Sequence, residues 1–170
     1  MSTRHHPPGV QNQAWGMAFI AALVLLQGAC LRGVTTGGEW PDVALAGALL
    51  IALRFGSAAG LTAGLTAGLL MGWTSGLALP AFLVSRSLPP LATGWMRDHL
   101  HGDNFVAQLA AVVCGLFGAE VLFALCCSEV VDAPHWLSRV VTRAVLTAAV
   151  TPALAWLVAR LPLPEERLAP

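Results

Sequence analysis

Two charged side chains inside long apolar stretches of this 170-residue chain, Arg86 and Glu120, are its first candidates for chemistry. Arg86 lies in the segment from Leu77 to Met96, and Glu120 lies in the segment from Phe105 to Cys127. Counted from one side of a bilayer, their depths differ by roughly 6 Å at a rise of 1.5 Å per residue. Because an unpaired ion inside a membrane is costly, we expect the two to form an intramembrane ion pair.

This pair has two interpretations. It could be a substrate or proton site, or it could be a structural pin that joins two helices. A proton relay would need a second acidic residue at a similar depth, and the sequence offers none. The structural pin is therefore the favoured interpretation.

The other side chains capable of catalysis or metal binding do not form a set. All five histidines lie outside the apolar segments, so Ser75, which follows Trp73-Thr74, has no histidine to activate it as a nucleophile. One polar loop does contain possible metal ligands: Asp98, His99, His101 and Asp103. Nothing else in that loop completes a coordination sphere around a metal ion. We expect no metal, no cofactor and no enzymatic activity.

The four cysteines also lack a reactive pattern. None of them stands in Cys-x-x-Cys spacing, and Cys126 and Cys127 are adjacent, which disfavours a bridge between them. We interpret Cys30, Cys114, Cys126 and Cys127 as small apolar residues of membrane helices.

Six apolar segments must position these residues. A span of the bilayer needs about 20 apolar residues, so 170 residues accommodate five or six spans with short loops. The expected fold class is all-α: a polytopic membrane protein with six transmembrane helices in one compact bundle. Residues 14–161 form the helical domain, between tails at 1–13 and 162–170. The expected segments are Ala14–Leu31, Val43–Leu53, the glycine-rich 56–76, Leu77–Met96, Phe105–Cys127 and Leu137–Leu161.

The third segment carries glycine at every fourth position. In a soluble helix each interior glycine would cost about 1 kcal/mol relative to alanine. In a membrane, small residues at i and i+4 let helix backbones approach closely, and helices associate through that packing. We therefore predict a helix-packing interface that contacts another helix or a partner protein, formed by Gly56, Gly60, Gly64, Gly68, Gly72 and Gly76.

Composition narrows the class of protein. Hydrophobic residues make up 56% of the chain and charged residues only 11%, which is not the composition of an ordinary soluble domain. The formal net charge is zero, which argues against nucleic acid as a partner.

The distribution of arginine between the two sides of the membrane predicts the orientation of the chain. The side that holds both termini has the larger number of arginines, so both termini are predicted to be cytoplasmic. That side holds Arg4, Arg54, Arg97, Arg160 and Arg167, against Arg32, Arg139 and Arg143 outside.

The order of these features resembles the rod shape-determining membrane protein MreD family over about Ala14 to Arg160. The motifs that carry the resemblance are Trp40-Pro41-Asp42 before the second helix, Ala52-Leu53-Arg54-Phe55-Gly56 at the turn, and the glycine-rich third helix ending at Gly76. Glu120 resembles an acidic position of the family's fifth helix. The chain departs from the family at Gly72, where members often carry an aspartate.

The resemblance implies a non-enzymatic scaffold in the bacterial inner membrane. MreD-like proteins pack with the bitopic protein MreC to maintain rod shape and direct lateral peptidoglycan synthesis. Through MreC they act indirectly with MreB, RodA and a class B penicillin-binding protein.

A second class of function stays open. The family looks similar in fold to the six-span substrate-binding subunits of energy-coupling-factor transporters, which bind vitamin-type small molecules. Ala14, Ala18 and Ala22 form a small-residue stripe like the one with which those subunits dock their transport partner. Because such stripes are common in membrane helices, the scaffold is the favoured interpretation.

Overall fold

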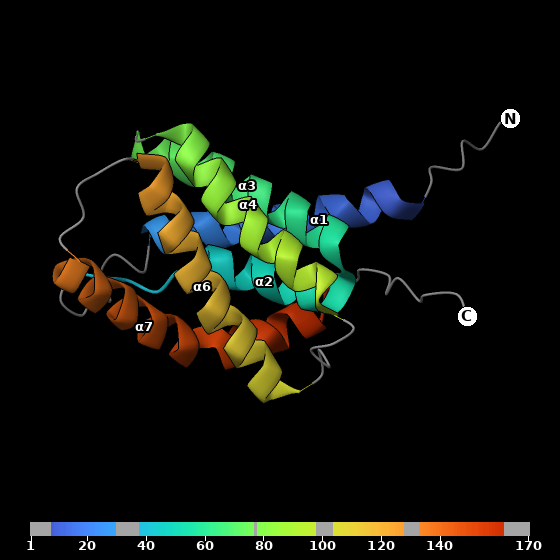
Figure 1. The fold of residues 1–170 in the computed structure, drawn as a ribbon. Coiled ribbons are helices and arrows are strands. Elements are labelled where there is room, and N and C mark those ends of the chain that lie inside the picture. The colour runs from blue at the N-terminus through green and yellow to red at the C-terminus, as the bar shows by residue number, and fades with distance from the viewer. Residues whose placement is uncertain (1–7, 30–37, 77, 98–103, 128–132, 162–170) are drawn as a thin grey trace, which may run out of the picture.

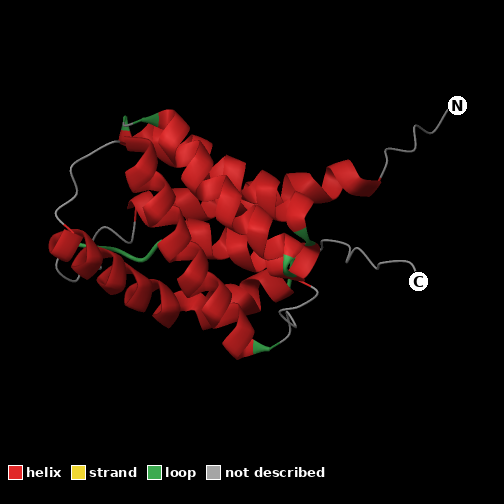
Figure 2. Cartoon of the chain, in the orientation of Figure 1, coloured by secondary structure: helices red, strands yellow, loops and turns green. Residues whose placement is uncertain are grey.

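The described part of the chain is entirely helical apart from short turns (Figures 1 and 2). A computed structural model describes residues 8–29, 38–76, 78–97, 104–127 and 133–161. Its helices are α1 (Pro8–Ala29), α2 (Val43–Phe55), α3 (Ser57–Ser75), α4 (Leu79–Trp95), α6 (Phe105–Cys127) and α7 (Ala133–Ala159). The predicted all-α class is confirmed.

Helix α1 begins earlier than the sequence indicated. It starts at Pro8, inside the segment 1–13 that we expected to be a tail. Proline suits the first turn of a helix because its missing N–H would have no intrahelical partner there. The start of the helix is therefore set by local backbone chemistry, whereas the apolar run begins only at Ala14.

Successive helices alternate in direction, so the bundle has two ends (Figure 1). The terminal end holds the start of α1 and the end of α7, and the opposite end, here called the far end, holds the start of α2 and of α7. Among the described residues, two helices are long and apolar enough to cross a membrane by length and composition: Phe105–Cys127 and Pro134–Ala159.

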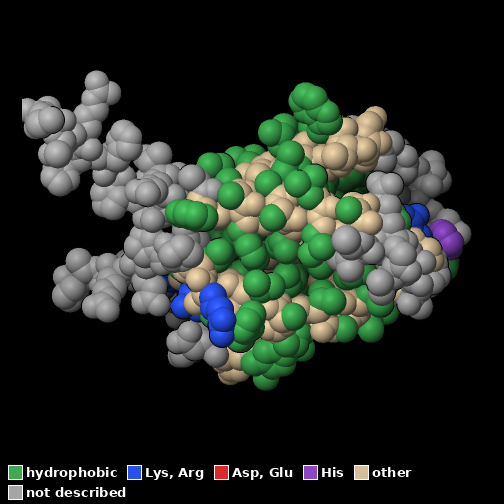
Figure 3. All heavy atoms as spheres, turned by 180° about the vertical axis from the view of Figure 1, so that it is seen from behind, with side chains coloured by type: hydrophobic (Ala, Val, Ile, Leu, Met, Phe, Trp, Pro, Cys, Tyr) green, Lys and Arg blue, Asp and Glu red, His purple; other side chains and the backbone are tan. Residues whose placement is uncertain are grey.

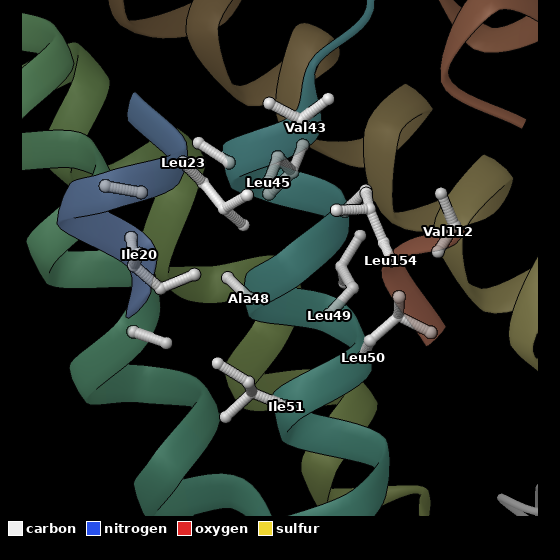
Figure 4. Packing of buried hydrophobic residues seen from close by; sticks show 14 of the residues in the cluster. Ile20, Leu23, Val43, Leu45, Ala48, Leu49, Leu50, Ile51, Val112 and Leu154 are labelled. Carbon is white, nitrogen blue, oxygen red and sulfur yellow. The ribbon is translucent and has the colours of Figure 1, made fainter. Parts of the chain in front are cut away.

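Helix α2 is the centre of the core. Every residue in it except Arg54 is buried. Figure 4 shows its side chains packed between α1, which contributes Ile20 and Leu23, and the pair α6 and α7, which contribute Val112 and Leu154. A helix that is apolar on all sides needs neighbours on all sides, and this explains why α2 lies inside the bundle.

Local signals define both ends of α2. Asp42 is its N-cap, and the Asp42 carboxylate accepts a hydrogen bond from the backbone N–H of Leu45. At the other end Gly56 has φ of 93°, a conformation that side chains rarely tolerate, and the chain turns there into α3. Gly76, with φ of 65°, ends α3 in the same way.

The glycine ladder of α3 packs against α4. A Cβ atom added at Gly68 would lie 2.7 Å from the Phe82 carbonyl oxygen, and one added at Gly60 would lie 2.7 Å from the Pro90 carbonyl oxygen. At Gly64 the added atom would collide with the carbonyl group of Arg86. The two backbones are therefore in direct contact, as small-residue faces in membranes allow.

Four of the six ladder glycines take part in this contact. Gly72 is the fourth, with the Leu79 side chain 2.6 Å from its would-be Cβ. Gly56 and Gly76 instead serve the turns at the two ends of α3. The structure thus places the packing part of the ladder inside the chain's own bundle, where α4 fills it.

All six tryptophans lie close to the ends of the bundle. Trp15, Trp95 and Trp156 lie towards the terminal end, and Trp40, Trp73 and Trp136 lie towards the far end. Five of them are exposed, from 36% for Trp40 to 83% for Trp95. On the face shown in Figure 3 the described side chains are mostly hydrophobic, and no acidic side chain is visible among them.

The α3–α4 contact predicts a sharp difference between two glycine substitutions. Gly64→Ala should lower the melting temperature of the detergent-purified protein, because overpacking costs about 1–3 kcal/mol and the obstructing atoms are backbone. Gly118→Ala on α6 is the matched control, since nothing lies within 4 Å of its would-be Cβ. Equal melting temperatures for the two variants would contradict close α3–α4 packing.

Candidate functional site

The far half of the bundle contains a chain of six charged side chains with alternating sign. They come from the segment before α2 and from three helices. In order of contact they are Asp42, Arg86, Glu120, Arg143, Glu39 and Arg139. This set, called here the ionic network, contains every acidic residue that the structure describes.

The innermost pair joins the N-terminus of α2 to α4. Arg86 Nη1 lies 2.6 Å from Asp42 Oδ2, and the two side chains are only 4% and 2% exposed. Because Nη1 and Nε of Arg86 make no aligned hydrogen bond with the described residues, this contact is a close ion pair rather than a fork-shaped one.

Asp42 serves several partners at once. Besides Arg86, its carboxylate accepts from Leu45 N–H at 3.1 Å, and its own backbone N–H donates to Thr147 Oγ1 at 2.9 Å. Thr147 in turn donates to the Arg143 carbonyl oxygen at 2.7 Å. The start of α2 is thereby tied to α4 and α7 through one fully buried residue.

Glu120 on α6 bridges two arginines. Its Oε1 lies 3.6 Å from Arg86 Nη2 and 2.6 Å from Arg143 Nη1. The structure therefore brings together Arg86 and Glu120, the two residues expected to pair. The closest partner of each is a different residue, however: Asp42 for Arg86 and Arg143 for Glu120.

Glu39, itself buried, joins Arg143 to the exposed Arg139. Its Oε2 accepts from Arg143 Nη2 at 2.6 Å and Nε at 3.1 Å, and its Oε1 accepts from Arg139 Nε at 2.7 Å. Burial alone would raise the pKa of the Glu39 carboxyl, but Arg143 and Arg139 outweigh burial and hold that pKa below its usual 4.5. Glu39 thus stays ionised between two guanidinium groups.

The network changes from buried to exposed along its length. Side-chain exposure is 4% at Arg86, 12% at Glu120 and 16% at Arg143, falls to 9% at Glu39, and reaches 55% at Arg139, the last member. Its three carboxylates and three guanidinium groups balance each other. The arrangement can therefore hold four separate segments together without leaving a net charge in the interior.

A further polar contact lies beside the network. Gln27, which interrupts the first apolar run, accepts a hydrogen bond from the Ala44 N–H with its side-chain oxygen at 3.2 Å. That N–H belongs to the first turn of α2, where backbone donors lack intrahelical partners. Gln27 therefore joins α1 to the same end of α2 that Asp42 fixes.

Sequence reasoning missed four members of the network. It assigned no ionic partner to Glu39 or Asp42, and it assigned Arg139 and Arg143 to the outside. The two arginines could have been found from their spacing, because Arg139 and Arg143 are four residues apart and so share one face of a helix. Arg143 also lies well inside an apolar segment, as Arg86 does.

None of the other candidates among the described residues belongs to the ionic network. The loop with His99 and His101 lies outside the described residues, as does Cys30. Cys114 and Cys126 are exposed free thiols on α6. Within the described ranges, no group of three or more His, Cys, Asp or Glu side chains is arranged to hold a metal ion.

No protein-family model, curated protein or solved structure matches this chain. The fold and the site alone define its class: an all-helical bundle joined by a buried ionic network.

The exposure gradient predicts unequal costs for two similar substitutions. Arg86→Gln should strongly lower the melting temperature in detergent, because removing one partner of a buried pair costs about 3–5 kcal/mol. Arg139→Gln, the matched control at the exposed end, should cost no more than about 1 kcal/mol. Equal losses would contradict the gradient.

The lowered pKa of Glu39 predicts a pH dependence. A carboxyl with a depressed folded-state pKa stabilises the fold above its unfolded value, here 4.5, and that contribution is lost as pH falls through the folded value. The parent should therefore melt at a higher temperature than Glu39→Gln near neutral pH, and the difference should shrink below pH 4.5. A difference that does not change with pH would show that Glu39 is not held ionised by its arginines.

Proposed function

We propose that this chain is a non-enzymatic scaffold of the bacterial inner membrane, of the MreD type, that packs with MreC in the cell-elongation machinery. One observation carries the proposal: the charged side chains inside the bundle pair with one another. These side chains are Asp42, Arg86, Glu120, Arg143 and Glu39. Such a network fixes helix positions, which is what an adaptor needs. The proposal assigns no catalytic residue, cofactor or nucleic-acid partner.

Several features support a six-span arrangement in the lipid bilayer. Tryptophan is enriched at both membrane interfaces, and the six tryptophans divide equally between the two ends of the bundle. Arg54, Arg97 and Arg160 lie at the terminal end, which favours a cytoplasmic position for both termini. Helices shorter than 20 residues, such as α2, are compatible with this arrangement when their neighbours bury them.

The residues that resemble the MreD family have structural roles that fit the proposal. Asp42 of Trp40-Pro41-Asp42 caps α2 and pairs with Arg86, and Gly56 makes the α2–α3 turn. Glu120 links α4 to α7. The proposal extends through MreC to MreB, RodA and a class B penicillin-binding protein, and to lateral peptidoglycan synthesis.

A transporter subunit that binds a vitamin-type molecule is the second candidate. One observation favours it: Ala18 and Ala22 are exposed on α1, so these two alanines of the stripe are available for docking. The exposed stripe would also suit the scaffold, and the buried charges are already paired within the protein. The scaffold is therefore our first proposal.

Depletion of the protein in its rod-shaped host tests the two candidates against each other. The scaffold predicts rounded cells with dispersed lateral wall synthesis, measured by imaging a fluorescent D-amino acid, and unchanged vitamin uptake. Depleted cells that stay rod-shaped while losing uptake of one vitamin would reverse the order of the two proposals. Complementation with the parent gene is the control for both measurements.

A further inference from the structure

Helix α7 presents a continuous exposed face along its length. It packs against α2 and α6, and on its other side exposed residues recur at spacings of three and four: Val141, Val145, Ala149, Pro152 and Trp156. Val145 is 64% exposed near the middle of the helix. The face is apolar and carries small residues beside large ones. Its surface is therefore uneven, and the side chains of another helix can pack into it.

An exposed cation lies near the start of α7, to one side of this face. Arg139 is 55% exposed, more than any other charged side chain described at the far end. Among the described residues its contact with Glu39 uses Nε, which leaves the two terminal NH2 groups of the guanidinium available to a second acceptor. Arg139 is also the end of the described chain of alternating charges, so an anion would continue that chain.

The position of Arg139 favours a carboxylate on a neighbouring helix over a lipid phosphate. Arg139 lies three residues after the half-buried Trp136, which is about 4.5 Å further into the bundle along the helix axis. An unrestrained arginine would extend outward to the headgroups, but Glu39, itself buried, holds Arg139 Nε at 2.7 Å. The guanidinium is therefore fixed at a depth that a side chain of an adjacent helix can reach.

Other exposed faces lack this combination. On α3 the exposed residues Leu65, Leu69 and Trp73 are also spaced by four, but α3 contains no charged residue. On α6 the one charged residue, Glu120, is paired inside the bundle. Charge complementarity therefore distinguishes α7.

We propose that the exposed face of α7 docks a single transmembrane helix of a partner protein, and that an Asp or Glu near the far end of that helix pairs with Arg139. The inference rests on the proposed function, because the partner is the bitopic protein that a scaffold of this type would hold. It adds the helix that makes the contact and the charge that the partner must carry.

Copurification with a tagged MreC-type protein of the same host tests this docking surface. The full chain is expressed in membranes as the parent, as Val145→Trp, or as the matched control Leu69→Trp, whose site on α3 is 46% exposed. Val145→Trp should reduce the captured partner at least tenfold, while Leu69→Trp leaves capture unchanged. Since both sites are exposed, both variants should keep the parent's melting temperature.

Charge reversal tests the ionic contact. Arg139→Glu should reduce capture, and reversal to Arg of one acidic residue near the far end of the partner helix should restore it. Arg139→Gln should give an intermediate loss and serves as the milder variant if Arg139→Glu does not fold.

The outcomes separate the two levels of the proposal. If the parent captures the partner and Leu69→Trp abolishes capture while Val145→Trp does not, the α7 surface is overturned and the scaffold function stands. If the parent captures no partner, both proposals fail. If Arg139→Glu leaves capture intact but reduces the phospholipid retained after purification, the acceptor is a headgroup and the carboxylate contact is wrong.

Discussion

Ionised side chains can be buried in a helical bundle only if opposite charges meet there, and the buried pair of Asp42 and Arg86 meets this condition in the far half of the bundle. Removing either charge would leave the other in a low-dielectric interior, which is strongly destabilising. The pair therefore constrains the distance between the start of α2 and the middle of α4. Thr147 extends the constraint to α7, since it accepts from the backbone N–H of the same aspartate.

The glycine ladder and the ionic network are parts of one arrangement. The backbone of α3 at Gly64 contacts the carbonyl group of Arg86, so the ladder determines where α4 carries its arginine. A larger residue at Gly64 would push α4 away from α3. This coupling explains why the ladder faces α4. Because the ladder is used within the bundle, contacts with other proteins must use exposed faces of other helices, such as that of α7.

The sequence predicted the helices well and the site only in part. The predicted segment Phe105–Cys127 has the same first and last residues as α6. The polar residues on both sides of this apolar run indicate where the helix begins and ends. Arg86 and Glu120 were identified because charge inside an apolar run is conspicuous. Glu39 and Asp42 were not, since acidic residues before a helix ordinarily remain in solvent, and only the packing of α2 inside the bundle buries them. The prediction for Gly64 was likewise incomplete. The spacing of the glycines predicts a close contact with another helix, but it does not indicate which helix makes that contact.

The most direct test of this account is a double-mutant cycle between Asp42 and Arg86, followed by unfolding in detergent. Asp42→Asn keeps an oxygen that can cap α2 at Leu45, so it removes the charge while retaining the cap. The account predicts that Arg86→Leu alone is the most destabilised variant and that adding Asp42→Asn restores much of the loss, with a coupling free energy above about 1 kcal/mol. Additive losses in the double variant would contradict a buried ion pair as the constraint on which the bundle depends.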